Sequence, residues 1–168
     1  PGGSSPLETV GHVDAALELA AQIRAGLLPE PAALYVPLGS GGTVAGLALG
    51  CAMAGLATRI VAVRVVERLL VNATLVRLLV RRTAALLRRL GARGLPRVVD
   101  NLELVHDQFG GRYGRPTPAA ERAVALAAEH GGVALETTYS AKALAALIAH
   151  APRLAADGAP VLFCNTYN

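Results

Sequence analysis

Gly39-Ser40-Gly41-Gly42-Thr43 is the stretch around which the rest of the sequence can be ordered. It directly follows the apolar run Ala33–Leu38 and directly precedes the apolar run Val44–Leu49. This order predicts a buried strand, a glycine turn and the first turn of a helix. Glycines leave the backbone amides of such a turn uncovered, and the helix N-terminus carries partial positive charge. We therefore expect this stretch to cradle a phosphate group.

The composition indicates one globular domain with a substantial core. The chain has 168 residues, 53% of them hydrophobic, and a mean hydropathy of +0.44, which excludes a disordered protein. The longest apolar stretch, Leu69–Val80, contains Arg77 and is too short to span a membrane, so no membrane partner is expected. No signal peptide is visible, but the sequence begins Pro1-Gly2-Gly3 without Met, so this absence carries no weight.

The charged residues, cysteines and histidines argue against a nucleic-acid-binding or metal-binding function. The net charge is +4, and Lys142 is the single lysine among 16 basic residues. The arginines of segment 68–93 have helical spacing and no aromatic residue between them, which favours a solvated helix face over a nucleic-acid surface. Cys51 and Cys164 lack CxxC spacing and are read as reduced thiols of a cytoplasmic protein. The histidines lack metal-ligand spacing, so no metal site is expected.

Strand patterns and helix patterns alternate along the whole chain. Helix N-caps are expected at Ser5 (with Glu8 completing a capping box), Asn72 and Thr138, and a further helix is expected to start at Thr117-Pro118. The alternation predicts an α/β fold, with a doubly wound, mainly parallel sheet of about five strands and helices on both faces. It also predicts a single domain over residues 1–168. The expected strands lie at 33–38, 59–66, 102–105, 133–136 and 161–164, and the last expected helix at 139–149.

Ligand-binding residues are expected where the strands end, because ligands of such sheets bind beyond the carboxyl edge. The segments that follow the five strands are Gly39–Thr43, Glu67, Tyr113, Tyr139-Ser140 and Asn165-Thr166. Amides for a phosphate, hydroxyls for ring substituents and a tyrosine to close over a ring suit an aromatic, phosphorylated ligand. Each position alone also has a structural interpretation, as a turn, a packed loop residue or a helix cap.

Two common phosphate motifs fit the glycine stretch poorly. A Walker A loop is excluded because no Gly-Lys-Ser/Thr follows the glycines. The dinucleotide fingerprint is half met, since Val44 stands where the third small residue belongs and Glu67 comes later than the usual ribose-binding acid. A nucleotide-binding Rossmann domain stays open as the alternative, but a phosphate monoester fits the compact loop better.

The glycine stretch, with Ala45-Gly46-Leu47 behind it, resembles the phosphate loop of fold-type II pyridoxal-phosphate enzymes. The closer resemblance is to the D-cysteine desulfhydrase and 1-aminocyclopropane-1-carboxylate deaminase family. It implies a large domain like that of the tryptophan synthase β subunit and pyridoxal 5'-phosphate as cofactor. Four further segments agree in order and spacing, namely Pro1–Leu7, Tyr113–Thr117, Thr138–Leu144 and Val161–Thr166.

The resemblance assigns roles to residues at the strand ends. It implies that Gly39–Thr43 holds the cofactor phosphate and that Thr166 faces the pyridine nitrogen. It also implies that Tyr113 and Tyr139 line the substrate side. A neutral hydroxyl at Thr166 does not keep the pyridine ring protonated, so the electron sink is weaker, which suits β-elimination.

Two positions separate the branches of this family. Deaminases carry glutamate after the second tyrosine and leucine in the motif of the last strand, whereas this chain has Ser140 and Thr166. The small hydroxyl residues favour a desulfhydrase-like lyase acting on a small amino acid over a deaminase. Two departures from the family pattern, Thr166-Tyr167-Asn168 after the last strand and Ala141 in place of a common glycine, leave the substrate open.

A pyridoxal-phosphate enzyme needs a lysine that forms a Schiff base with the cofactor. Lys142 does not match the family's Schiff-base residue. The Schiff-base lysine is therefore expected in an N-terminal half that this sequence lacks, together with the small domain. The chain is then expected to be a C-terminal half, inactive alone, of an enzyme that forms a homodimer when full length. A non-catalytic domain that binds a nucleotide or another phosphate, and a structural fragment that binds nothing, are the alternatives.

Overall fold

The computed structural model describes residues 4–166. Pro1-Gly2-Gly3 and Tyr167-Asn168, which belong to two of the quoted segments, lie outside the described residues. The elements, in chain order, are α1 (Pro6–Arg24), β1 (Ala33–Leu38), α2 (Gly42–Ala54), β2 (Arg59–Arg64), α3 (Ala73–Arg89), β3 (Leu102–Val105), α4 (Pro118–Gly131), α5 (Ser140–Asp157) and β4 (Val161–Phe163).

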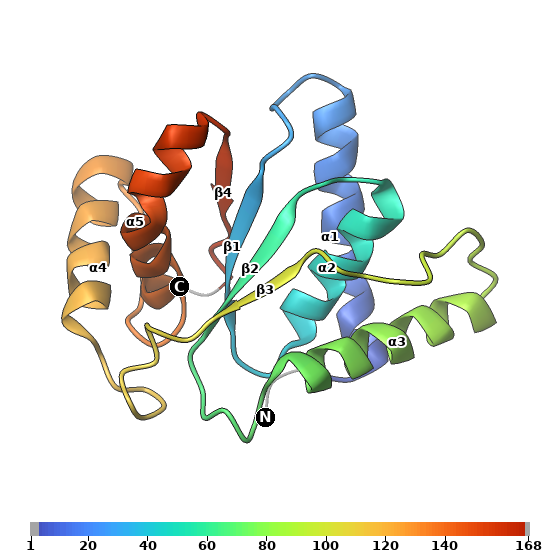
Figure 1. Cartoon of the computed structure of the whole chain (residues 1–168), viewed down its shortest axis with the longest axis horizontal. Coiled ribbons are helices and arrows are strands. Elements are labelled where there is room, and N and C mark those ends of the chain that lie inside the picture. Colours follow the sequence, from blue (N-terminus) through green and yellow to red (C-terminus); the bar gives the residue numbers. More distant parts are fainter. Residues whose placement is uncertain (1–3, 167–168) are drawn as a thin grey trace.

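The four strands form one parallel sheet in the order β3-β2-β1-β4. The chain moves outward from β1 through β2 to β3 and then returns to the other side of β1 as β4 (Figure 1). This reversal makes the sheet doubly wound and puts a topological switch point between β1 and β4. The α/β class expected from the sequence is confirmed.

Side-chain alternation along β1 builds two cores. Leu34, Val36 and Leu38 pack into a core with α1, α2 and α3, whereas Ala33 and Tyr35 pack into a second core with α5. The period of two along a strand causes this division, because successive side chains point to opposite faces. Figure 1 shows α1, α2 and α3 on one face of the sheet and α4 and α5 on the other, with α4 packed against α5.

The expected helix starts at Ser5, Asn72 and Thr117 are confirmed. Ser5 and Glu8 form the capping box of α1. The side chain of Asn72 accepts from the backbone N–H groups of Thr74 and Leu75 at 3.0 and 3.1 Å, and Thr117 accepts from that of Ala120 at 3.1 Å. These side chains satisfy helix donors that have no partner inside the helix.

The strand expected at 133–136 is wrong, and so is the cap expected at Thr138. Residues 132–136 connect α4 to α5 without joining the sheet. The Glu136 carboxylate accepts from the backbone N–H groups of Thr138 and Tyr139, each at 2.6 Å, and of Ser140 at 2.8 Å. Glu136 therefore caps the N-terminus of α5, and these bonds hold the residues just before α5 in a turn.

Element boundaries differ in smaller ways. α5 continues through Pro152 to Asp157, well past the expected end at residue 149. β2 ends at Arg64 and β4 at Phe163, somewhat earlier than expected. Among residues 4–166, no helix combines the length and the apolar character that a membrane span requires.

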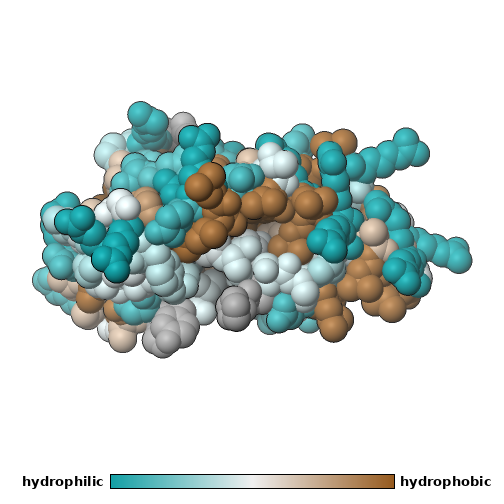
Figure 2. Space-filling view, turned by 90° about the horizontal axis from the view of Figure 1, so that it is seen from below, coloured by the Kyte–Doolittle hydropathy of each residue, from teal (hydrophilic) through white to brown (hydrophobic). Residues whose placement is uncertain are grey.

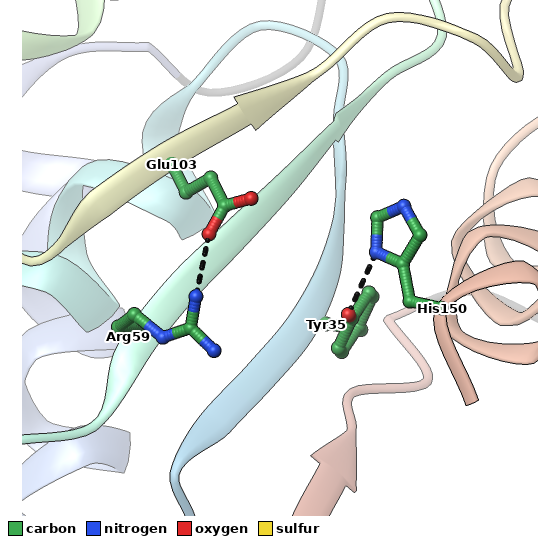
Figure 3. A network of polar contacts seen from close by, with 4 residues as sticks. All are labelled: Tyr35, Arg59, Glu103 and His150. Atoms are coloured by element: carbon green, nitrogen blue, oxygen red, sulfur yellow. Dashed lines mark hydrogen bonds and ion pairs between the residues drawn. The ribbon is translucent and has the colours of Figure 1, made fainter. Parts of the chain in front are cut away.

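Two polar contacts join neighbouring elements around the sheet (Figure 3). The hydroxyl of Tyr35, a residue only 2% exposed, lies 2.9 Å from Nδ1 of His150 on α5. A buried phenol needs such a partner, so this contact ties β1 to α5. Arg59 and Glu103 join β2 to β3 at 2.9 Å, but both side chains are about half exposed, so this ion pair contributes little stability.

Candidate functional site

A cavity of about 490 Å³ opens at the carboxyl edge of the sheet, at the switch point between β1 and β4. Figure 2 looks onto this edge, where the surface is hollowed beside a band of apolar residues. The segments that meet there are far apart in the sequence. The cavity is lined by Glu8, His12, Pro37, Gly39, Ser40, Gly41, Gly42, Thr43, Val44, Tyr113, Tyr139 and Thr166.

The glycine stretch forms one wall of the cavity through its backbone. Gly41 has a φ of +96°, which side chains disfavour, and a Cβ at Gly39 would lie 3.0 Å from Cε1 of Tyr139. Gly41 is also the N-cap of α2, and no side chain among the described residues caps this helix. The first amides of α2 therefore carry partial positive charge without a side-chain acceptor, as a phosphate-binding turn requires.

Two tyrosines from different elements meet over the cavity. The hydroxyls of Tyr113 and Tyr139 lie 2.6 Å apart, and their rings meet edge to face with centroids 6.0 Å apart. Tyr113 is 47% exposed, and its backbone N–H donates to Oε1 of Glu67 at 3.2 Å. The loop after β3 is thus joined to the end of α5 that faces the cavity.

Most of the residues expected at the site come together, with one exception. Gly39–Thr43, Tyr113, Tyr139 and Thr166 all line the cavity. Ser140 does not line it, because its side chain is fully buried and its Oγ accepts from the backbone N–H of Glu136 at 3.3 Å. Ser140 therefore belongs to the turn that positions Tyr139.

Sequence reasoning missed two residues of the cavity wall, Glu8 and His12 on α1. Nε2 of His12 lies 3.2 Å from Oγ1 of Thr43, and burial lowers the pKa of His12. The Glu8 carboxylate accepts from the hydroxyl and the backbone N–H of Ser5 at 2.6 and 3.1 Å. Their spacing of four residues places both on one helix face, but only the three-dimensional arrangement shows that this face meets the glycine stretch.

Lys142 lies away from the cavity. Its side chain is fully buried in the first turn of α5, and its Nζ donates to the backbone carbonyl of Phe109 at 3.0 Å. Burial lowers the pKa of Lys142, and the nearby Glu136 carboxylate opposes this shift. The lysine thus holds the loop after β3 against α5. Within the described part of the chain, no three His, Cys, Asp or Glu side chains gather closely enough to hold a metal ion.

Comparison with known families finds a match over nearly the whole chain. Residues 1–166 match the family described as pyridoxal-phosphate dependent enzyme. The chain belongs to this family. Among curated relatives, it is 32% identical to the D-cysteine desulfhydrase of Salmonella newport (strain SL254) and 34% identical to that of Salmonella schwarzengrund (strain CVM19633). Each alignment covers 98% of this chain and 48% of the relative, so the chain spans about half the length of these relatives.

Solved structures give the same fold. The crystal structure of an ACC deaminase homologue matches with a TM-score of 0.76 and 28% identity, over 97% of this chain and 46% of that chain. The processed form of threonine deaminase isoform 2 from Solanum lycopersicum matches with a TM-score of 0.54 and 16% identity, over 90% of this chain and 44% of that chain. The second likeness shows the fold alone. The fold-type II resemblance seen in the sequence is confirmed.

Proposed function

We propose that this chain forms the cofactor-binding part of a pyridoxal-phosphate dependent lyase of the D-cysteine desulfhydrase kind, which acts on a small amino acid by α,β-elimination. The observation that carries the proposal is the meeting of an uncapped α2 N-terminus, two tyrosines and Thr166 in one cavity at the switch point. The 32–34% identity to D-cysteine desulfhydrases supports the reaction type.

The cavity wall fits the cofactor's phosphate and ring. The amides at the start of α2 and the hydroxyls of Ser40 and Thr43 would hold the phosphate. Thr166 lines the same cavity and would be the neutral partner of the pyridine nitrogen. Bound pyridoxal phosphate supplies the electron sink for the substrate's Cα carbanion. Because Thr166 carries no charge, it would not hold a proton on that nitrogen, which suits the loss of a β-substituent.

The tyrosine pair serves the substrate side of the cavity. Tyr113 and Tyr139 share one hydrogen bond of 2.6 Å, so one hydroxyl donates to the other and the accepting hydroxyl directs its own proton to a third group. We assign the protonation of the leaving thiolate to this pair. Ser140 acts indirectly, because it lies in the turn whose backbone holds Tyr139.

The lysine that links to the cofactor is assigned to a part of the protein outside this chain. The burial of Lys142 and its bond to the Phe109 carbonyl support this assignment, since its amine is committed to a loop. Residues 1–168 are then most of the large domain of a cytoplasmic homodimer. When pyridoxal phosphate is added, the wild-type chain and Lys142→Met should give the same absorbance spectrum, because Lys142 forms no Schiff base. An absorbance band of the wild type that is lost in this variant would contradict the assignment.

Thermal unfolding with two matched ligands tests the cofactor site. Pyridoxine 5'-phosphate lacks the aldehyde, so it binds without forming a covalent bond, and pyridoxine lacks the phosphate as well. Because a ligand that binds the folded state raises its stability, we expect the phosphate ester to raise Tm and pyridoxine to leave it unchanged at the same concentration. Stabilisation by a nucleotide but not by pyridoxine 5'-phosphate would instead favour a nucleotide-binding domain.

A further inference from the structure

His12 lines the proposed cofactor cavity but has no role in the function proposed above. It comes from α1, whereas the phosphate-binding residues come from the start of α2. Its imidazole lines the same cavity, and its Nε2 lies 3.2 Å from Oγ1 of Thr43. The side chain is therefore in contact with a hydroxyl that the proposed function places on the phosphate.

Close packing of α1 on α2 positions the base of this side chain. A Cβ added at Gly46 would lie 2.4 Å from Cβ of His12 and 2.7 Å from the carbonyl oxygen of Thr9. The backbone of α1 thus rests directly on α2 at this point, and this packing fixes the position of the His12 Cβ beside the cavity. The contact between His12 and Thr43 is therefore formed across the packed interface of α1 and α2.

The tautomer of His12 decides what Thr43 offers to a ligand. If Nε2 of His12 is unprotonated, Thr43 donates its only hydroxyl proton to it and presents lone pairs to the cavity. If Nε2 carries a proton, His12 donates to Oγ1, and the Thr43 proton is free for a third group. A phosphate dianion accepts hydrogen bonds only, so it favours the second arrangement.

We propose that His12 is a positioning residue that donates Nε2–H to Oγ1 of Thr43 and so directs the Thr43 hydroxyl proton at the ligand's phosphate. The inference rests on the cofactor site proposed above and adds a residue to it. Phosphate binding then selects the Nε2-protonated imidazole and favours its doubly protonated, cationic form as well.

Few charged groups compete with this effect. Glu8, one turn earlier on α1, lines the cavity but is hydrogen-bonded to Ser5. Tyr113 and Tyr139 also line the cavity. On α2 the only titratable residue is Cys51, which is buried in the core. Four arginines of α3 line other hollows, namely Arg77, Arg81, Arg82 and Arg88. Burial lowers the pKa of His12, so the imidazole is neutral near pH 7 without ligand.

Ligand affinity in matched variants tests the proposal. We expect His12→Phe to weaken binding of pyridoxine 5'-phosphate about three- to tenfold, the effect of one hydrogen bond. His12→Gln, whose amide reaches the same place, should stay within about twofold of wild type. Thr43→Val should weaken binding at least as much as His12→Phe does. The double variant should lose little more than Thr43→Val alone, because His12 acts only through the Thr43 hydroxyl.

A spectroscopic readout separates positioning from a structural role. In NMR spectra of the ¹⁵N-labelled chain, pyridoxine 5'-phosphate should shift His12 to the Nε2-protonated form and raise its pKa, and pyridoxine should do neither. If the wild type binds the ester but the tautomer and pKa of His12 do not move, or His12→Phe binds equally well, the proposal is overturned and the cofactor site stands. If the wild type binds no ester, the cofactor site and this inference fall together.

Discussion

At Gly39 and Gly41 the lack of a side chain has two different consequences. A Cβ at Gly39 would meet the Tyr139 ring at 3.0 Å, so glycine there allows the tyrosine to close over the cavity. Gly41 instead supplies a backbone conformation, with a φ of +96°, that turns the chain into α2. Both requirements were foreseeable as a glycine turn, but the partner of Gly39 was visible only in the structure.

Gly41→Ala should destabilise the protein and weaken phosphate binding together. The left-handed conformation costs a residue with a side chain about 1–2 kcal/mol, and Val76 lies 3.4 Å from the new Cβ. Gly55→Ala is the matched control, because Gly55 has a φ of +74° but no atom within 4 Å. Urea unfolding should show a loss in both variants, whereas affinity for pyridoxine 5'-phosphate should fall only in Gly41→Ala. Equal affinity in the two would argue against the loop as the phosphate site.

His106 is expected to make stability fall in mild acid. Its Nδ1 accepts from Nε of Arg64 at 2.9 Å, and burial together with the Arg64 and Arg68 guanidinium groups lowers the pKa of His106. The unfolded chain, with a histidine pKa of about 6.5, binds the proton more readily, so this stability is present above that pH and is lost as pH falls toward the folded pKa.

Replacement by asparagine tests this dependence, since its amide oxygen also accepts from Arg64. His106→Asn should lose less stability than wild type between about pH 7.5 and 5.5, a range that brackets the ordinary histidine pKa, as measured by the urea midpoint. At the upper end of that range it should match wild type. Some acid dependence should persist, because burial also lowers the pKa of His12. An unchanged loss in the variant would show that the contact between His106 and Arg64 is not the cause.

At the scale of elements, two glycines let α1 and α2 approach closely. A Cβ at Gly50 would lie 2.6 Å from Cβ of Ala16 and 2.6 Å from the carbonyl oxygen of Val13. Gly50→Ala should therefore cost about 1–3 kcal/mol by overpacking. Gly11→Ala, on the exposed side of α1 with nothing within 4 Å, should instead gain roughly 0.5–1 kcal/mol from helix propensity. Denaturant unfolding that gave both changes the same sign would contradict this packing.

The cap of α5 predicts a second effect at this scale. The Glu136 carboxylate accepts from three backbone N–H groups, the last two belonging to Tyr139 and Ser140. Glu136→Ala should cost about 1–2 kcal/mol, as the loss of a helix cap does. It should also loosen Tyr139, so chemical shifts of both Tyr113 and Tyr139 should move. Thr138→Ala is the control and should change neither stability nor the tyrosine shifts by much.

Local patterns predicted most elements but not the role of the segment before α5. Alternation and caps identified β1, β2 and β3, because propensity and burial agree there. At 133–136 the apolar run ending in Glu136 has the pattern of a short buried strand, yet the carboxylate is used as a cap. A single acidic residue that serves a helix a few positions later leaves no periodic signal. The apolar pattern therefore predicted a strand, but the hydrogen bonds of Glu136 to the start of α5 hold this segment in a turn.

At the scale of the whole molecule, strand order explains why the site could largely be predicted. The carboxyl ends of parallel strands share one edge, so residues after β1 and β4 must meet at the switch point. This logic placed Gly39–Thr43 and Thr166 together. It could not place Glu8 and His12, because the position of α1 over the glycine stretch depends on helix packing that the spacing of residues does not encode.

The measurement that most directly tests whether the glycine stretch holds the cofactor phosphate is a map of amide chemical shifts during titration with pyridoxine 5'-phosphate. The account predicts the largest changes at the amides of Gly41, Gly42 and Thr43, and none of that size with pyridoxine. A second cavity provides the competing site, since Arg77, Arg81, Arg88 and Arg97 line it. Largest changes along that arginine-lined cavity, with the glycine amides unmoved, would contradict the account.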